Sequence, residues 1–143
     1  MSDHELVEAA RKYLGVPFVH RGRSRQGLDC AGLIKLSLED IGFPVQDYLL
    51  YGRTPHNGEL ERTIEARLGP AVAIAPVRSS QLHVGDVVLV RYRVEPHHVA
   101  IVTDYPYGGL AVIHTDGHTG RVVEHRLAED MVRRITHVFR RSV

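Results

Sequence analysis

The sequence of 143 residues lacks several features that would point to particular kinds of protein. It has a single cysteine, which excludes an internal disulfide and a metal cage built of thiolates. Its 18 Lys and Arg residues nearly balance its 17 Asp and Glu residues, so neither nucleic acid nor an anionic membrane surface is an expected partner. No apolar run is long enough for a membrane span, and residues 1–5 have neither the basic nor the apolar region of a secretion signal. We expect a chain made in the cytoplasm without a signal peptide and without membrane insertion.

What is present fits one globular domain over residues 1–143, with 43% hydrophobic and 24% charged residues. The first half has helical periodicity, and the second half has short β-branched runs bounded by turn residues. Helices followed by an antiparallel meander predict an α+β domain, in which N-terminal helices pack on a C-terminal antiparallel sheet or small barrel. The expected helices span residues 3–14, 30–41 and 57–68, the expected strands span 87–92, 98–103, 110–114, 121–127 and 135–140, and residues 71–81 are expected to be irregular.

The single cysteine, Cys30, lies between a polar loop at residues 21–27 and the second predicted helix. The thiol is therefore expected in the first helical turn, where unpaired backbone N–H groups and the positive end of the helix dipole stabilise a thiolate. We expect a lowered thiol pKa and a nucleophilic role. The alternative is that Cys30 is a small buried apolar side chain at a helix start.

A thiol nucleophile needs an imidazole to take its proton and a third polar group to orient that imidazole. His98 opens one predicted strand and His114 closes the next. If these strands pair as a hairpin across the turn at residues 105–109, the two histidines lie side by side. Cys30, His98 and His114 are therefore the predicted catalytic residues, and the alternative is that the two histidines are ordinary surface residues at strand ends.

Several segments of the chain resemble the NlpC-type cell-wall peptidases, a papain-like family of cysteine endopeptidases. They are Tyr-Leu-Gly-Val-Pro-Phe at 13–18, Gly-Leu-Asp-Cys-Ala-Gly-Leu-Ile at 27–34, Val-Gly-Asp-Val-Val-Leu-Val at 84–90, His-Val-Ala-Ile-Val at 98–102 and Ile-His at 113–114. The resemblance implies a single papain-like domain with Cys30 as nucleophile, His98 as base and His114 as the orienting third residue. It also implies hydrolysis of peptidoglycan stem peptides at the γ-D-glutamyl–diamino acid bond, with no metal and no other cofactor.

The short chain, the run at residues 120–126 and the segment at residues 133–140 resemble the stand-alone peptidases of tailed phages and gene transfer agents. This second likeness implies a lytic enzyme that is carried in a phage-like tail. Its partners would then include tail proteins, and it would act in the periplasm or the cell wall.

The chain departs from the family pattern at two positions near the cysteine, where Ala31 and Phe18 replace residues that carry hydroxyl groups. In relatives, those hydroxyls help the preceding aspartate, here Asp29, to hold the free amine of a stem peptide. Whether a free N-terminal L-alanine is required is therefore open. Arginines of the 21–27 loop are expected either to meet substrate carboxylates or to form a solvated loop. The residues expected to bind substrate are Asp29, Phe18, His20, Arg21, Ala31 and His97.

Three other interpretations stay open. The same catalytic residues serve acyltransferases and lipid amidases of related fold. A structural tail protein that keeps the fold without the activity is a second alternative. The third is a metal site, for which the candidate ligands are His114, Asp116, His118, His97, His98 and His125.

Overall fold

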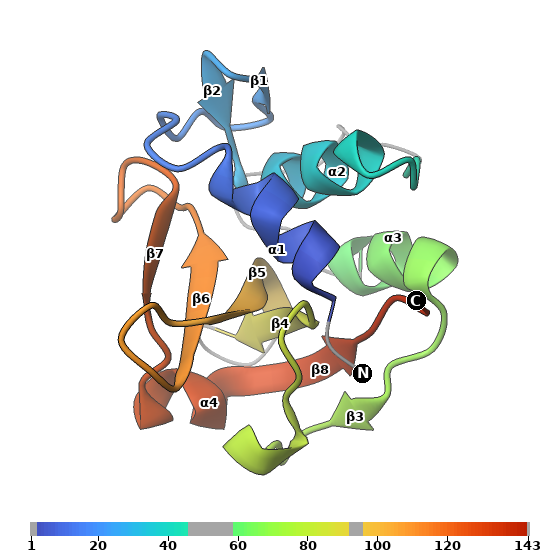
Figure 1. Ribbon diagram of the computed structural model, residues 1–143. Coiled ribbons are helices and arrows are strands. Elements are labelled where there is room, and N and C mark those ends of the chain that lie inside the picture. The colour runs from blue at the N-terminus through green and yellow to red at the C-terminus, as the bar shows by residue number, and fades with distance from the viewer. Residues whose placement is uncertain (1–2, 46–58, 92–95, 143) are drawn as a thin grey trace.

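The computed structural model describes residues 3–45, 59–91 and 96–142, with the backbone alone described at residues 59, 96 and 97. Helices and one short hairpin come first along the chain and a large sheet follows, as Figure 1 shows. The elements are α1 (His4–Arg11), β1 (Arg23–Ser24), β2 (Gly27–Leu28), α2 (Cys30–Asp40), α3 (Glu59–Leu68), β3 (Ala73–Ile74), a 3₁₀ turn (Ser79–Gln81), β4 (Val87–Arg91), β5 (Pro96–Asp104), β6 (Leu110–His114), β7 (Val123–Arg126), α4 (Glu129–Arg134) and β8 (Ile135–Phe139).

The main sheet has six strands in the order β3-β8-β4-β5-β6-β7, and every neighbouring pair is antiparallel. The two outer strands, β3 and β7, each pair with one neighbour, so the sheet in the described part of the chain is open. The predicted antiparallel sheet is thus confirmed, and the alternative of a small closed barrel is wrong. The final strand was expected to continue the meander, but β8 pairs with β4 on the opposite side of the sheet from β7.

The sheet separates two apolar clusters, because alternate residues of a strand point to opposite faces. On one face, α1, α2 and α3 pack against residues such as Leu89 and Ile101. On the other face, α4 and the segment 77–82 pack against residues such as Val88 and Val102. Strand β4 is buried on both faces, as its unbroken apolar run predicted.

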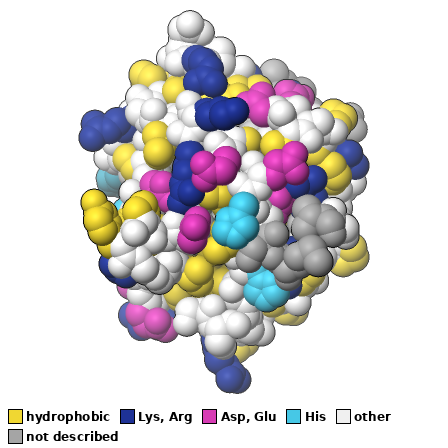
Figure 2. Space-filling view, viewed as in Figure 1, with side chains coloured by type: hydrophobic (Ala, Val, Ile, Leu, Met, Phe, Trp, Pro, Cys, Tyr) yellow, Lys and Arg dark blue, Asp and Glu magenta, His cyan; other side chains and the backbone are white. Residues whose placement is uncertain are grey.

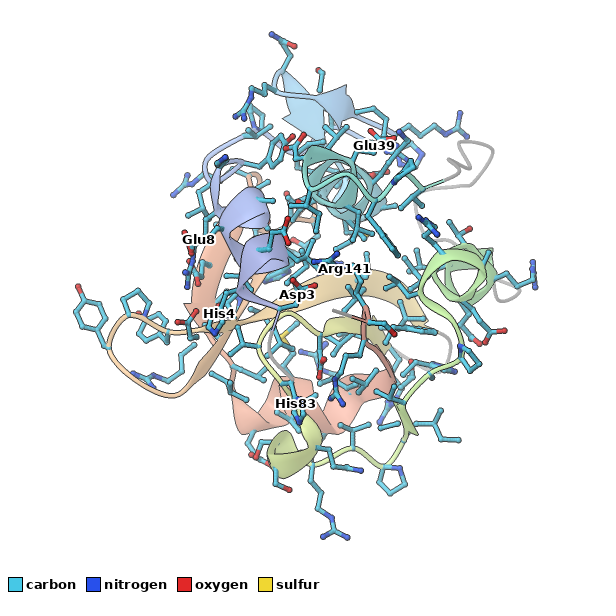
Figure 3. The ribbon with its side chains drawn as sticks, turned by 45° about the vertical axis from the view of Figure 1, so that its right-hand side comes forward. Asp3, His4, Glu8, Glu39, His83 and Arg141 are labelled. Atoms are coloured by element: carbon cyan, nitrogen blue, oxygen red, sulfur yellow. The ribbon has the colours of Figure 1, made fainter. Side chains whose placement is uncertain are left out.

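Helix α1 is held at its start by a carboxylate shared with the other end of the chain. Oδ1 of Asp3 accepts the backbone N–H of Leu6, which caps the helix. The guanidinium of Arg141 binds both oxygens of the same carboxylate, at 2.8 and 2.9 Å. Figure 3 shows Asp3 and Arg141 next to each other, where the two ends of the described chain meet.

The loop before α2 is more ordered than the sequence predicted, because β1 and β2 form a short antiparallel hairpin. This hairpin packs tightly on the first turn of α2. A Cβ on Gly32 would overlap the carbonyl oxygen of Gly22 and crowd Arg23 and Asp29. A glycine at this position therefore allows the loop to approach the helix that begins at Cys30.

Three other expectations have clear outcomes. The irregular segment at 71–81 contains the short strand β3 and the 3₁₀ turn, and helix α4 lies where the sequence predicted no helix. The third helix is confirmed as α3, whereas Asn57, at which the sequence predicted the start of this helix, lies outside the described residues.

The described helices include none that is long and apolar enough to cross a membrane. On the face shown in Figure 2, basic and acidic side chains are interspersed and no large area carries charge of one sign. This pattern matches the near-balance of charge in the sequence.

We expect Gly32→Ala to lower the free energy of unfolding by about 2 kcal/mol, because relief of the clash with the Gly22 carbonyl must shift backbone. This cost exceeds the gain of up to about 1 kcal/mol that alanine usually brings to a helix. Urea unfolding followed by circular dichroism measures the difference. Gly117→Ala is the matched control, because a Cβ there meets nothing within 4 Å. Equal stability of the two variants would contradict the tight approach.

Candidate active site

Cys30 is the first residue of α2, as the sequence predicted. Oδ1 of Asp29 accepts the backbone N–H of Gly32 at 2.8 Å and so caps the helix. Cys30 as a residue is half-buried, its thiol is turned into the protein, and the backbone N–H groups of Val99 and Ala31 lie close to the sulfur. The thiol therefore lies where the start of α2 meets β5, beside the residue that follows His98.

Burial dominates the acidity of the thiol. Burial, followed by the negative charge of Asp29, raises the pKa of Cys30 to about 12. The two backbone N–H groups and the Arg23 guanidinium lower the pKa but do not compensate. The predicted lowering of the pKa is wrong for the free protein, because it considered the helix terminus and left out the loss of solvent. At neutral pH the thiol keeps its proton, so a base must remove it during a reaction.

His98 and His114 lie side by side, as the predicted hairpin requires. Nε2 of His98 is 2.8 Å from Nδ1 of His114, and the two rings are nearly perpendicular, at 77°. Both side chains are buried, with exposed fractions of 2% and 6%. Strands β5 and β6 pair with Ile101 opposite Ile113. Continued by one pair, this register sets His114 opposite Ala100 and therefore diagonally beside His98.

A third histidine, His125 on β7, extends the pair. Its Nε2 is 2.7 Å from Nε2 of His114, and its Nδ1 is 3.0 Å from the carbonyl oxygen of Arg126. Val123 pairs with His114, so His125 lies two residues further along β7 on the same face of the sheet. From the sequence, His125 was predicted only as a candidate metal ligand. The signal for its place in the site is this spacing, which follows once the turn at residues 115–120 is taken as a hairpin.

Burial also controls the charge of the middle histidine. It lowers the pKa of His114 to about 4, and the neighbouring His125 contributes in the same direction, whereas Asp116 opposes both. His114 is therefore neutral at neutral pH.

One group of possible metal ligands exists among the described residues. Single ligand atoms of His98, His114 and Asp116 lie within 4.8 Å of one another. Two nitrogens on one tetrahedral zinc ion are about 3.3 Å apart, given Zn–N distances of 2.0–2.1 Å. The 2.8 Å between His98 and His114 is instead a hydrogen-bond distance. His118 is exposed on the turn after β6, and the side chain of His97 is outside the described part.

Asp29 was predicted to hold substrate, and the structure engages both its oxygens within the chain. Besides the cap to Gly32, Oδ1 accepts from Arg23 at 2.7 Å, and Oδ2 accepts the backbone N–H of Arg21 at 3.0 Å. The carboxylate is buried, with 4% exposed. To bind a substrate amine, Asp29 would therefore have to exchange one of these bonds.

Two of the loop arginines have structural contacts. Arg23 forms the ion pair with Asp29, and Arg25 donates to the carbonyl of Lys12 while its guanidinium lies over the Tyr13 ring. The side chains of Arg21 and Arg25 are exposed, whereas Arg23 is half-buried.

The other predicted substrate residues surround the start of α2. Phe18 pairs with Leu28 next to the cysteine helix, Ala31 packs on the apolar cluster under α2, and both are half-buried, as is His20. Their roles in binding stay predictions.

A thiol at a helix start, packed against an antiparallel sheet that carries buried histidines, is the architecture of papain-like cysteine hydrolases. The chain belongs to the NlpC/P60 family, whose family model matches residues 15–141. Members of this family are peptidoglycan hydrolases, and a cysteine peptidase fits the family. The predicted family, fold class and type of enzyme are thereby confirmed.

Solved structures with the same fold include enzymes of bacterial cell walls. The NlpC/P60 domain of the peptidoglycan hydrolase SagA matches with a TM-score of 0.60 and 21% identity, over 96% of this chain and 97% of that one. An NlpC/P60 family protein from Bacillus cereus matches with a TM-score of 0.66 and 20% identity, over 96% of this chain and 39% of its own. An N-acetylmuramoyl-L-alanine amidase from Bacteroides uniformis matches with a TM-score of 0.60 and 12% identity, over 98% of both chains. A search of curated proteins finds no match.

Alkylation of Cys30 by iodoacetamide, followed by mass spectrometry against pH, is expected to have its midpoint above the ordinary thiol value of about 8.5. The reason is that burial and Asp29 raise the thiol pKa in the folded protein. The same protein unfolded in urea is the control and should return to the ordinary value. A midpoint below 7 in the folded protein would show instead a stable thiolate.

The stability of the protein is expected to fall as the pH drops from 6.5 towards 4, partly through His114. In this window the unfolded chain protonates His114 near its ordinary pKa of 6.5, while the folded chain resists protonation down to about 4. The full effect amounts to about 3 kcal/mol.

Urea unfolding at pH 6.5 and pH 5 should therefore show a smaller loss of stability in His114→Gln than in the wild type. His118→Gln, on the exposed turn, should behave as the wild type does. An unchanged loss in His114→Gln would exclude this residue as the cause.

Proposed function

We propose that this chain is a cysteine endopeptidase that hydrolyses peptidoglycan stem peptides, with Cys30 as nucleophile, His98 as base and His114 as the residue that orients His98. The observation that supports it best is the position of the only thiol. The backbone N–H of Val99, directly after His98, lies close enough to the thiol to lower its pKa, and His98 is itself hydrogen-bonded to His114. Nucleophile, base and orienting group thus come from two adjoining segments, α2 and the β5–β6 hairpin.

In the proposed reaction, His98 takes the thiol proton while the sulfur of Cys30 attacks the amide carbonyl of the substrate. The backbone N–H of Cys30, at the first helical position, has no partner within the helix and is suited to donate to the oxyanion. His98 then gives its proton to the leaving amine, and the C–N bond breaks. Water, deprotonated by His98, hydrolyses the thioester and restores the thiol.

This order of events suits a thiol that is protonated at rest. With the pKa of Cys30 raised to about 12, attack and proton transfer have to occur together instead of starting from a stored thiolate. The base must therefore be neutral and must have a lone pair available near the sulfur.

The bond that we propose is the γ-D-glutamyl–diamino acid linkage, on the basis of the resemblance to the NlpC-type peptidases. A second candidate is the bond between the glycan and L-alanine, because one solved structure of the same fold is an N-acetylmuramoyl-L-alanine amidase. An acyltransferase that passes the acyl group to an acceptor other than water is a third. The products separate the three: a shortened stem peptide, an intact stem free of the glycan, or an acceptor that carries the acyl group.

We also propose that the enzyme is delivered by a phage-like tail and acts in the periplasm or cell wall. The support is the likeness of residues 120–126 and 133–140 to the stand-alone peptidases of tails. The alternative is a structural tail protein without activity, and digestion of peptidoglycan by the purified protein distinguishes the two.

Purified protein incubated with peptidoglycan is expected to release stem-peptide fragments, identified by liquid chromatography and mass spectrometry. Cys30→Ala should lower turnover at least about 10³-fold because it removes the nucleophile, and His98→Ala should lower it about 10²- to 10⁴-fold. Circular dichroism checks that both variants stay folded, and His118→Ala on the exposed turn is the activity control. Full activity of Cys30→Ala would refute the mechanism, and an inert wild type would favour the structural alternative.

A further inference from the structure

The three histidines of the site form one continuous hydrogen-bonded chain across three adjacent strands. Nε2 of His98 meets Nδ1 of His114 at 2.8 Å, and Nε2 of His114 meets Nε2 of His125 at 2.7 Å. Both pairs of rings are nearly perpendicular, at 77° and 76°, with centroids 4.9 Å apart. Beyond the third ring, Nδ1 of His125 lies 3.0 Å from the carbonyl oxygen of Arg126. This hydrogen-bonded chain of histidines therefore ends on a group that can only accept a hydrogen bond.

That last carbonyl determines the direction of every hydrogen bond in the chain. Because the oxygen accepts, Nδ1 of His125 must carry the proton, and Nε2 of a neutral His125 is then an acceptor. Nε2 of His114 must donate to it, which leaves Nδ1 of neutral His114 as an acceptor. Nε2 of His98 must in turn donate to His114. The remaining nitrogen of a neutral His98, Nδ1, is then without a proton.

The resulting tautomer of His98 is the one that the reaction needs. The thiol of Cys30 keeps its proton at neutral pH, so the ring nitrogen of His98 that is not bonded to His114 has to accept that proton. In the opposite tautomer, Nδ1 of His98 would carry a proton and could not act as a base. The neutral state of His114 suits this arrangement, since burial lowers its pKa to about 4.

Water cannot easily replace these contacts at the inner end of the chain. His98 and His114 are buried, with 2% and 6% exposed, whereas His125 is exposed at the outer end. The inner two imidazoles therefore depend on each other and on the group at position 125 for their orientation. An exposed side chain at that position is also one that can be exchanged without disturbing the core.

We propose that His125 is a positioning residue that, through His114, holds His98 in the tautomer whose Nδ1 is free of a proton. It does so because the Arg126 carbonyl makes its Nε2 a hydrogen-bond acceptor. The role in peptide hydrolysis rests on the proposed function, whereas the assignment of the tautomer does not. The residue at position 125 matters as an acceptor, so its replacement should be judged by hydrogen-bonding polarity instead of by size.

Three variants at position 125 test whether the side chain there has to accept a hydrogen bond from His114. His125→Gln offers a side-chain carbonyl that can accept from His114, His125→Ala offers nothing, and His125→Lys offers only donors. A donor at position 125 would reverse both hydrogen bonds and place a proton on Nδ1 of His98. His118→Lys makes the same change of side chain on an exposed turn near the end of β6 and is the control.

The first measurement is the ¹⁵N NMR spectrum of the histidine side chains at pH 7.5, which distinguishes protonated from unprotonated ring nitrogens. We expect an unprotonated Nδ1 on His98 in the wild type and in His125→Gln, a mixture in His125→Ala, and a protonated Nδ1 in His125→Lys. The second is the rate of Cys30 alkylation by iodoacetamide at the same pH. It should fall at least tenfold in His125→Lys, stay within twofold in His125→Gln and in His118→Lys, and lie between these values in His125→Ala.

The direction of the effect in His125→Lys is diagnostic. An added positive charge alone would favour the thiolate and speed alkylation, whereas reversal of the hydrogen bonds slows it. With peptidoglycan as substrate, kcat should follow the same order as alkylation while KM is unchanged. If the NMR spectra and the alkylation rates of the three His125 variants agree with these expectations and peptidoglycan is not cleaved, the positioning role stands and the proposed function fails.

Two results would overturn the proposal. One is a His98 tautomer and an alkylation rate in His125→Lys that equal those of the wild type. The other is loss of the His98 tautomer in Asp116→Asn with no change in the His125 variants, which would assign the control to the carboxylate near His98 and His114.

Discussion

The candidate site depends on one buried carboxylate, that of Asp29. It caps α2 through Gly32, pairs with Arg23 and holds the backbone of Arg21, so helix, hairpin and loop converge on a single group. A buried carboxylate is tolerated because charged and backbone donors surround it. Together with burial, which is the larger cause, the same charge raises the pKa of the adjacent thiol. The interaction that places Cys30 therefore also keeps the thiol protonated.

Because the thiol is held in a place where it keeps its proton, the rest of the site has to supply a base. A histidine next to a protonated thiol can act as a base only if it is neutral and if its proton is on the ring nitrogen that faces away from the thiol. Burial keeps His114 neutral, and the hydrogen bonds from strand to strand supply the orientation. The register of β5, β6 and β7 thus affects the proposed reaction, because it determines which ring nitrogens of the three histidines form hydrogen bonds.

The sequence allowed the main elements and the central residues to be predicted. The cysteine at the start of α2 and the pairing of His98 with His114 followed from helical periodicity and hairpin geometry, and both agree with the structure. The predicted low pKa of the thiol does not agree with the structure, because burial is a property of the packed molecule and no local pattern reveals it. His125 was missed as a member of the site because its contact depends on the register of β7 against β6. Likewise, β8 was expected beyond β7, since sequence order does not show that the last strand returns to β4.

The ion pair between Asp3 and Arg141 joins residues that are 138 positions apart in the chain. Asp86 on the turn before β4 similarly depends on Arg140, which binds both its oxygens. Two buried carboxylates near the start and the middle of the sequence thus receive their positive partners from consecutive residues near its end. While the chain is being synthesised, both acids lack their arginine partners until residues 140 and 141 have left the ribosome. The finished packing of α1 and β4 can therefore form only after nearly the whole domain has emerged.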